Sequence, residues 1–161
     1  MKGKKTCREK LIISRIVKQL SKSSNPELLV SEISKISYQK KNIIDTPEKA
    51  AESFSSIKAK KQEHFAMLTL DGARQLINKH VVTIGTLTRT LVHPREVFAL
   101  AIEDRAASVI IAHNHPSGSL EISSEDRDVT SVMKKAGEIM NIPLDDHLII
   151  TENGFVSVPE K

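Results

Sequence analysis

Two histidines lie close to an aspartate in this sequence, at a spacing that suits metal binding. His113 and His115 follow an apolar run, residues 108–112, that is typical of a buried strand. Because side-chain direction repeats every two residues along a strand, both imidazoles are expected on the same face of a sheet. Pro116 lacks a backbone N–H and ends the strand. Asp126 falls in the first turn of the next helix, so two imidazoles and one carboxylate are predicted to converge.

This set of side chains favours a catalytic metal, and zinc suits it best because zinc binds both imidazole and carboxylate. A structural zinc site is usually closed by four protein ligands, rich in cysteine, but the only cysteine here, Cys7, is far away in sequence. Catalytic zinc has three protein ligands and keeps a fourth position for water, whose pKa falls to about 7. His113, His115 and Asp126 are therefore predicted as the zinc ligands of a hydrolytic site.

Each of these residues also has a purely structural interpretation. Ser123 and Asp126 match the Ser-x-x-Asp pattern that caps the start of a helix. A single histidine beside a core strand is more often a hydrogen-bonded core residue than a metal ligand. The combination of two histidines on one face, a proline and an acid in the next helix favours the metal site.

The same residues resemble a known family motif. Residues 113–116, His-Asn-His-Pro, followed after six residues by Ser123-x-x-Asp126, are similar to the His-x-His-Pro…Ser-x-x-Asp motif of the JAMM (JAB1/MPN) metalloproteases. The continuation Ser-Gly after His-Asn-His-Pro resembles the bacterial RadC-like branch of that family. Residues 92–98 and 146–150 match that branch as well.

The resemblance covers about residues 45–158 and implies a zinc-dependent hydrolase of peptide or isopeptide amide bonds. It implies roles for five side chains: zinc ligation by His113, His115 and Asp126, a hydrogen bond to the reacting carbonyl from Ser123, and proton transfer by Glu63. The residues alone do not select Glu63 over other acids, namely Glu96, Glu103, Glu121 and Glu125. Because an imidazole ligand must be neutral, activity is expected to fall at low pH.

Two further histidines, His93 and His147, are candidates for holding a metal ligand in place, and equally for core or capping roles. Three classes of function compete: a metallohydrolase, a DNA-repair or nucleic-acid-associated protein without proteolytic activity, and a non-catalytic scaffold. The complete ligand set argues against the scaffold. Zinc deaminases need His-x-Glu and Pro-Cys-x-x-Cys, which the sequence lacks.

Composition sets limits on the whole chain. Its 161 residues suffice for one domain with an appendage, and no apolar run approaches the roughly 18–20 residues of a membrane span. The basic start, residues 1–5, is not followed by the apolar segment of a secretory signal. A single cysteine fits a reducing cytoplasm. Aromatic residues are 3% of the chain and tryptophan is missing, which argues against a base-stacking surface.

Positive charge gathers in the first part of the chain. Residues 1–62 hold 15 Lys and Arg against 6 Asp and Glu, whereas residues 63–161 hold 9 against 14. We therefore expect a basic helical arm over residues 1–45, with helices at 6–21 and 27–37, ahead of a metal-binding domain over residues 46–161. Such an arm can bind phosphate backbones or an acidic protein, or can simply be solvated. The resemblance also implies a helix-hairpin-helix-like domain ahead of the metal domain, but after Gly3 the arm has no glycine for the turn of such a hairpin.

Within the domain, helices alternate with strands, which indicates an α/β sandwich with a mixed sheet flanked by helices. Helices are expected from Pro47 to about 57, 94 to about 106 and from 124 onward, and strands at 64–70, 76–84, 108–112, 147–151 and 155–158, with a strand or loop at 85–91. Residues expected to face the core from the second and third helices are Val97, Phe98, Ala101, Ile102, Val129, Val132, Met133, Ala136, Ile139 and Met140.

Overall fold

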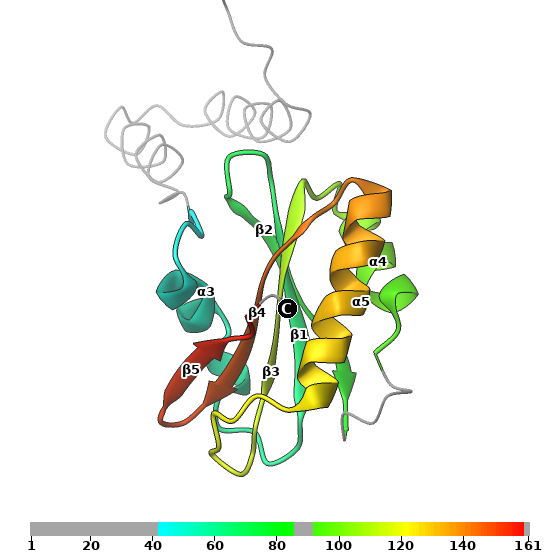
Figure 1. The fold of residues 1–161 in the computed structure, drawn as a ribbon. Coiled ribbons are helices and arrows are strands. Elements are labelled where there is room, and N and C mark those ends of the chain that lie inside the picture. Colours follow the sequence, from blue (N-terminus) through cyan, green and yellow to red (C-terminus); the bar gives the residue numbers. More distant parts are fainter. Residues whose placement is uncertain (1–41, 86–91, 160–161) are drawn as a thin grey trace, which may run out of the picture. The chain divides into compact units, whose positions relative to one another are not determined.

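The computed structural model describes residues 42–85 and 92–159 and shows an α/β fold, as predicted (Figure 1). Its elements, in chain order, are α3 (Pro47–Ser53), the 3-10 helix η1 (Ser55–Ile57), β1 (His64–Leu70), β2 (Leu76–Ile84), α4 (Pro94–Glu103), β3 (Ser108–Asn114), α5 (Ser124–Met140), β4 (Leu144–Thr151) and β5 (Gly154–Ser157). The helices predicted at 6–21 and 27–37, and most of the segment 85–91, lie outside the described residues.

The five strands form one mixed sheet in the order β2-β1-β3-β4-β5. β3 and β4 are parallel, and the other neighbouring pairs are antiparallel. A parallel pair needs a crossover connection, and α5 supplies it between β3 and β4. The predicted mixed sheet is therefore confirmed, and its central strand β3 is the one that carries the histidines.

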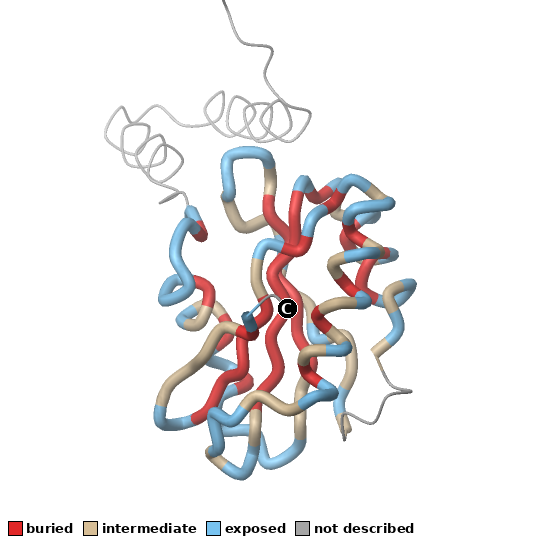
Figure 2. The backbone as a smooth tube through the Cα atoms, viewed as in Figure 1, coloured by how far each residue is buried: buried red, intermediate tan, exposed pale blue. Residues whose placement is uncertain are grey.

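Helices cover both faces of the sheet, which makes three layers (Figure 1). Because side chains alternate along each strand, β1 sends Ala66, Leu68 and Leu70 to the face covered by α3 and η1. It sends Phe65 and Met67 to the face covered by α4 and α5. The central strands are buried along almost their whole length, as the red tube in Figure 2 shows. This rigid double-sided core fixes the end of β3 in space.

The packed region begins before the first helix. Ile43 pairs with Gln75 as an isolated bridge, and Ile44 is buried in the cluster under α3. Thr46 then caps α3 by accepting a hydrogen bond from the backbone N–H of Lys49 at 3.4 Å, with proline in the first turn. The single helix predicted to residue 57 is α3 followed by one turn of 3-10 helix.

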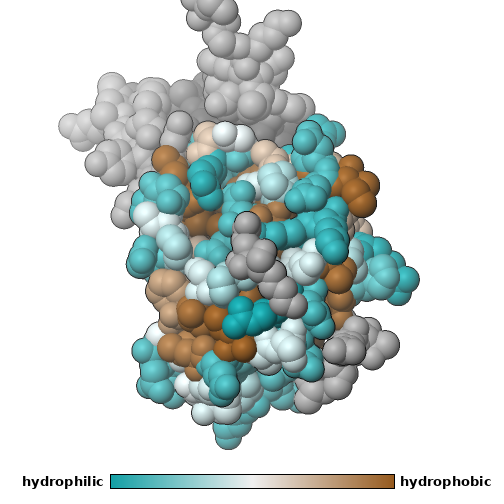
Figure 3. Space-filling view, viewed as in Figure 1, coloured by the Kyte–Doolittle hydropathy of each residue, from teal (hydrophilic) through white to brown (hydrophobic). Residues whose placement is uncertain are grey.

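Three residues that were expected in the core are exposed, which corrects the sequence prediction. Ile102 on α4 is 58% exposed, and Val132 and Ile139 on α5 are 50% and 87% exposed. Each helix packs on the sheet with one stripe only, so apolar residues outside that stripe stay at the surface. Figure 3 shows apolar surface at the C-terminal end of α5. Two stripe residues, Val97 and Met133, are buried as expected.

Helix α4 is also shorter than predicted. It ends at Glu103, three residues before the expected end, and Asp104 is its C-cap. Arg105 follows with a positive φ of 54°, a left-handed conformation that stops a helix. Among the described residues, no helix is both long enough and apolar enough to cross a membrane.

Candidate metal centre

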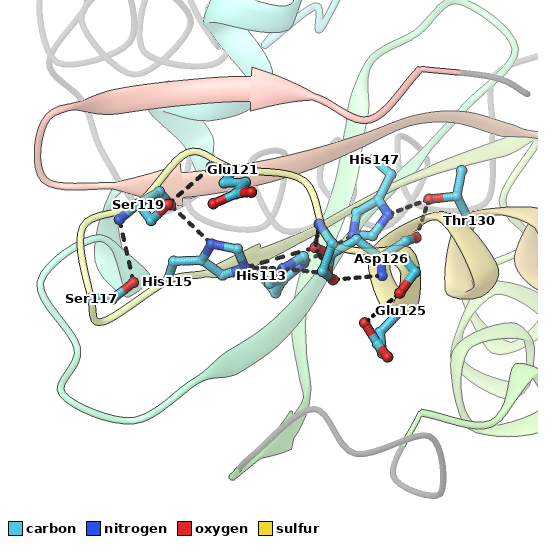
Figure 4. A network of polar contacts seen from close by, with 11 residues as sticks. His113, His115, Ser117, Ser119, Glu121, Glu125, Asp126, Thr130 and His147 are labelled. Carbon is cyan, nitrogen blue, oxygen red and sulfur yellow. Dashed lines mark hydrogen bonds and ion pairs between the residues drawn. The ribbon is translucent and has the colours of Figure 1, made fainter.

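The two histidines of the motif meet at the end of β3. His113 lies within the strand and is fully buried. His115 lies just beyond it, but its backbone N–H still donates to the carbonyl oxygen of Ile150 at 3.0 Å, so the strand geometry continues. The two Nε2 atoms are 3.0 Å apart (Figure 4). Each ring therefore presents the same nitrogen to a common point.

Asp126 brings a carboxylate to this point from the first turn of α5. Its Oδ1 lies 3.1 Å from Nε2 of His113, and its Oδ2 lies 4.0 Å from Nε2 of His115. The ligand atoms of the three residues all lie within 4.8 Å of one another. In the part of the chain that the structure describes, no fourth His, Cys, Asp or Glu joins this group.

Ser123 fixes the position of Asp126 through a capping box. The hydroxyl and the backbone N–H of Ser123 donate to Oδ2 of Asp126 at 2.6 and 2.8 Å. The backbone N–H of Asp126 donates in return to Oγ of Ser123 at 3.1 Å. The cap suggested by the Ser-x-x-Asp pattern is thus present, and it holds the same carboxylate that faces the histidines.

Burial by itself raises the pKa of Asp126, but the close contact with His113 and the hydrogen bonds from Ser123 outweigh this effect and hold the pKa well below its usual range. The carboxylate is therefore ionised at neutral pH. Because the ionised carboxylate of Asp126 is almost fully buried, it needs a positively charged partner.

The protonation of His115 shows what kind of partner fits. Its Nδ1 lies 2.9 Å from the carbonyl oxygen of Ser119, which can only accept a hydrogen bond. Nδ1 of His115 therefore carries the proton, and a neutral ring leaves a lone pair on Nε2, directed at the other two ligands. This donor set, with nitrogen and carboxylate oxygen, fits a divalent cation of the zinc type.

A third histidine, His147 on β4, lies behind the first. Its Nε2 is 3.0 Å from Nδ1 of His113, and its Nδ1 is 2.7 Å from the hydroxyl of Thr130 on α5 (Figure 4). Burial holds the pKa of His147 well below its usual range, so the ring is neutral. The sequence left the role of His147 open and gave no sign of Thr130, which lies one helical turn after Asp126.

The other open histidine, His93, has a capping role. Its Nδ1 accepts a hydrogen bond of 3.2 Å from the backbone N–H of Arg95 and so caps α4. His93 also lines a cavity of about 470 Å³ that adjoins the metal centre, where His113 and Asp126 form part of the wall. Most of the remaining wall is apolar, from Phe65, Val92, Val129, Val132 and Met133.

Glu63 lies immediately before β1, next to the end of β3. The antiparallel register pairs Phe65 with His113, and continuing it by two residues sets Glu63 opposite His115. The carbonyl oxygen of Glu63 accepts a hydrogen bond from Gly85 at 2.9 Å, which ties this position to the end of β2. By alternation, we expect the Glu63 side chain on the same face as Phe65, whose ring stacks on His113 at 6.5 Å between centroids.

Asn114, between the two histidines, was not singled out from the sequence. It is fully buried and points away from the metal centre, where its carboxamide binds three backbone groups of the segment before β1. A polar residue that strand alternation turns to the opposite face from the two histidines is the signal that could have indicated such a role.

Comparison with known proteins places the whole of this region in one family. The family model described as the RadC-like JAB domain matches residues 44–161. The chain belongs to the RadC-like JAB family. The resemblance of residues 113–126 to this branch is thereby confirmed, and the RadC-like JAB domain of this chain contains all the described elements.

Individual relatives agree with this assignment. A UPF0758 protein of Methanospirillum hungatei is 51% identical over 104 residues, which are 65% of this chain and 46% of the relative. A UPF0758 protein of Geobacillus sp. strain WCH70 is 44% identical over 130 residues, 80% of this chain and 58% of the relative. The chain thus spans about half the length of the curated relatives it matches.

Proposed function

We propose that this RadC-like JAB domain is a zinc-dependent metallohydrolase that cleaves an amide bond, either a peptide or an isopeptide bond. One observation carries the proposal: two imidazole Nε2 atoms and a carboxylate converge, with no fourth protein ligand in the described part of the chain. Three protein ligands with an open position are the pattern of catalytic rather than structural zinc.

His113, His115 and Asp126 would hold the ion, which supplies Lewis-acid chemistry toward water and a carbonyl group when bound. Glu63 would act as the general base, taking a proton from the attacking water and delivering it to the leaving amine. The expected position of Glu63, opposite His115 when the register of β1 and β3 is continued, supports this role.

Ser123 would donate a hydrogen bond to the oxygen of the reacting carbonyl. Its hydroxyl now donates to Oδ2 of Asp126, so this role requires the hydroxyl to rotate toward substrate. The backbone N–H of Ser123 continues to bind the same Oδ2, so the carboxylate stays in place. The cavity beside His113 would receive an apolar side chain of a protein or peptide substrate.

Metal analysis of purified protein tests the proposal. We expect about one zinc per chain and a sharp loss in His113→Ala and in Asp126→Ala. His93→Ala is the control, because His93 lines the same cavity but caps a helix, and this variant should keep its zinc. Full zinc in both ligand variants would refute the site. Zinc binding without hydrolysis of any peptide or isopeptide in a broad substrate library would refute the activity.

A nucleic-acid-associated role is the second candidate, and the excess of positive charge in residues 1–62 favours it. DNA binding through residues 1–45 would be salt-sensitive and would survive Glu63→Ala, because that side chain serves the hydrolytic role. Deletion of residues 1–45 should abolish it. The single cysteine fits a cytoplasmic location for either role.

A further inference from the structure

A chain of three buried groups runs from α5 through β4 to the metal centre. Thr130 is on α5, His147 on β4 and His113 on β3, and all three side chains are buried. Their polar atoms are joined by contacts of 2.7 Å between Thr130 and His147 and 3.0 Å between His147 and His113. Figure 4 shows the three side chains in sequence.

The direction of each hydrogen bond in this series of three side chains follows from the hydroxyl of Thr130. The hydroxyl of Thr130 lies 2.7 Å from the backbone carbonyl oxygen of Asp126, one turn earlier on α5. A carbonyl oxygen only accepts, so Thr130 uses its one proton there. Its oxygen can then only accept from Nδ1 of His147, which must carry a proton.

The contact of 3.0 Å between the two histidine rings gives the next step. Nδ1 of His147 already donates to Thr130, so Nε2 of His147 is the nitrogen left to accept from Nδ1 of His113. Nδ1 of His113 is therefore protonated, and the lone pair of that ring lies on Nε2, beside Asp126 and His115. The alternative, a cationic His147, would put an unpaired charge in a fully buried place.

We propose that Thr130 and His147 are positioning residues that select the metal-binding tautomer of His113. The inference rests on the proposed metal centre, but it concerns residues to which neither the motif nor the family assignment gives a role. It explains why α5 has a buried threonine one turn after its metal-facing aspartate: the same helix supplies one ligand and sets the protonation of another.

Two measurements on the 161-residue chain test this proposal. The first is nitrogen-15 NMR of histidine-labelled, metal-free protein, which reports whether Nδ1 or Nε2 of His113 carries the proton. We expect the Nδ1–H form in the wild type and in Thr130→Ser, which keeps the hydroxyl. In Thr130→Val, which has a similar shape but no hydroxyl, we expect a mixture of both tautomers.

The second measurement is zinc affinity by competition with a chelator. Thr130→Val should weaken zinc binding about 10-fold or more, in the range seen when a group that orients a ligand is removed. Thr130→Ser should stay within about threefold of the wild type, well below that range. Thr69→Val is the matched control, because Thr69 is also a buried threonine whose hydroxyl makes a 2.7 Å hydrogen bond, to Asp104, away from the metal centre. It should keep wild-type zinc affinity.

The outcomes separate this inference from the proposed function. A proton on Nε2 of His113 in the wild type, or unchanged zinc affinity in Thr130→Val, overturns the inference even if zinc binds. If the wild type binds no zinc, the proposed function fails, while the tautomer measurement still decides between the two states of His113. If Thr130→Val does not fold, the wild-type and Thr130→Ser spectra decide.

Discussion

Asn114 accepts a hydrogen bond of 2.7 Å from the backbone N–H of His64, and the two residues join the end of β3 to the start of β1. The amide of Asn114 also donates to the carbonyl oxygens of Lys60 and Gln62 at 3.0 and 3.1 Å. These three bonds surround Glu63 in the chain. The residue between the two histidines thus holds the segment that carries the proposed general base.

Replacing Asn114 should loosen that segment. We expect Asn114→Ala to lower the free energy of unfolding by about 2–4 kcal/mol, because it removes the three hydrogen bonds of a fully buried carboxamide. Chemical denaturation measures this loss. Asn153→Ala, at an exposed turn between β4 and β5, should change stability by less than about 1 kcal/mol. Equal stability of the two variants would contradict the role given to Asn114.

Glu63 should be needed for hydrolysis but not for metal binding. In Glu63→Gln we expect about one zinc per chain and a rate of amide hydrolysis lower by roughly 100- to 10,000-fold, the usual contribution of a general base. Zinc analysis and a peptidase assay give the two readouts. Gln substitutions at the other candidate acids serve as controls, and a comparable loss in any of them would move the base to that residue: Glu96, Glu103, Glu121 and Glu125.

The apolar cavity should bind a side chain next to the scissile bond. A hydroxamate with an isobutyl side chain should bind the zinc-loaded protein about tenfold more tightly than acetohydroxamate, or ~1.4 kcal/mol. Val132→Ser should remove most of this difference, because Val132 lines the cavity. Ile139→Ser is the matched control, since Ile139 is an exposed apolar residue further along the same helix. If binding titrations show the same ratio of the two hydroxamate affinities in both variants, the cavity is not the binding site of the isobutyl side chain.

Asp104 should make the fold sensitive to acid. Burial raises the pKa of Asp104, but hydrogen bonds from Thr69, His80 and Asn78 outweigh it and lower the pKa below its usual range. A lowered pKa in the folded state stabilises the protein above the unfolded value of about 3.9. This stabilisation disappears as the pH falls through the folded-state pKa.

Asp104→Asn should therefore reduce the free energy of unfolding at pH 7 by about 1–3 kcal/mol, the range for hydrogen bonds to a charged group. It should also flatten the dependence of stability on pH between roughly 5 and 3. Asp45→Asn, at an exposed ion pair with Lys49, should alter neither quantity appreciably. Denaturation curves across this pH range measure both effects.

Gly137 should tolerate no side chain, although it lies inside a helix. A Cβ there would lie 2.6 Å from the backbone carbonyl oxygen of Ile142 and 3.3 Å from the ring of Phe98. Alanine normally stabilises a helix relative to glycine, but here we expect Gly137→Ala to cost about 1–3 kcal/mol through overpacking. Gly72→Ala, where nothing lies within 4 Å of an added Cβ, should leave the melting temperature nearly unchanged.

The sequence by itself determined the order of the elements and the three residues, His113, His115 and Asp126, that meet at the candidate metal centre. Alternation along β3 placed both imidazoles on one face, and a capping pattern put Asp126 in the first turn of α5. Both are local signals, because a strand repeats every two residues and a cap involves neighbouring positions. The basic arm predicted over residues 1–45 stays a prediction.

Only the tertiary structure decided which residues support that centre and which apolar residues are buried. Thr130 and His147 are 17 residues apart in the chain, and they meet because α5 crosses back over β4. Val132 and Ile139 have the helical spacing of core residues, yet α5 presents them to the surface. Such pairings depend on how helices pack against the sheet, and the period of a single helix does not contain that information.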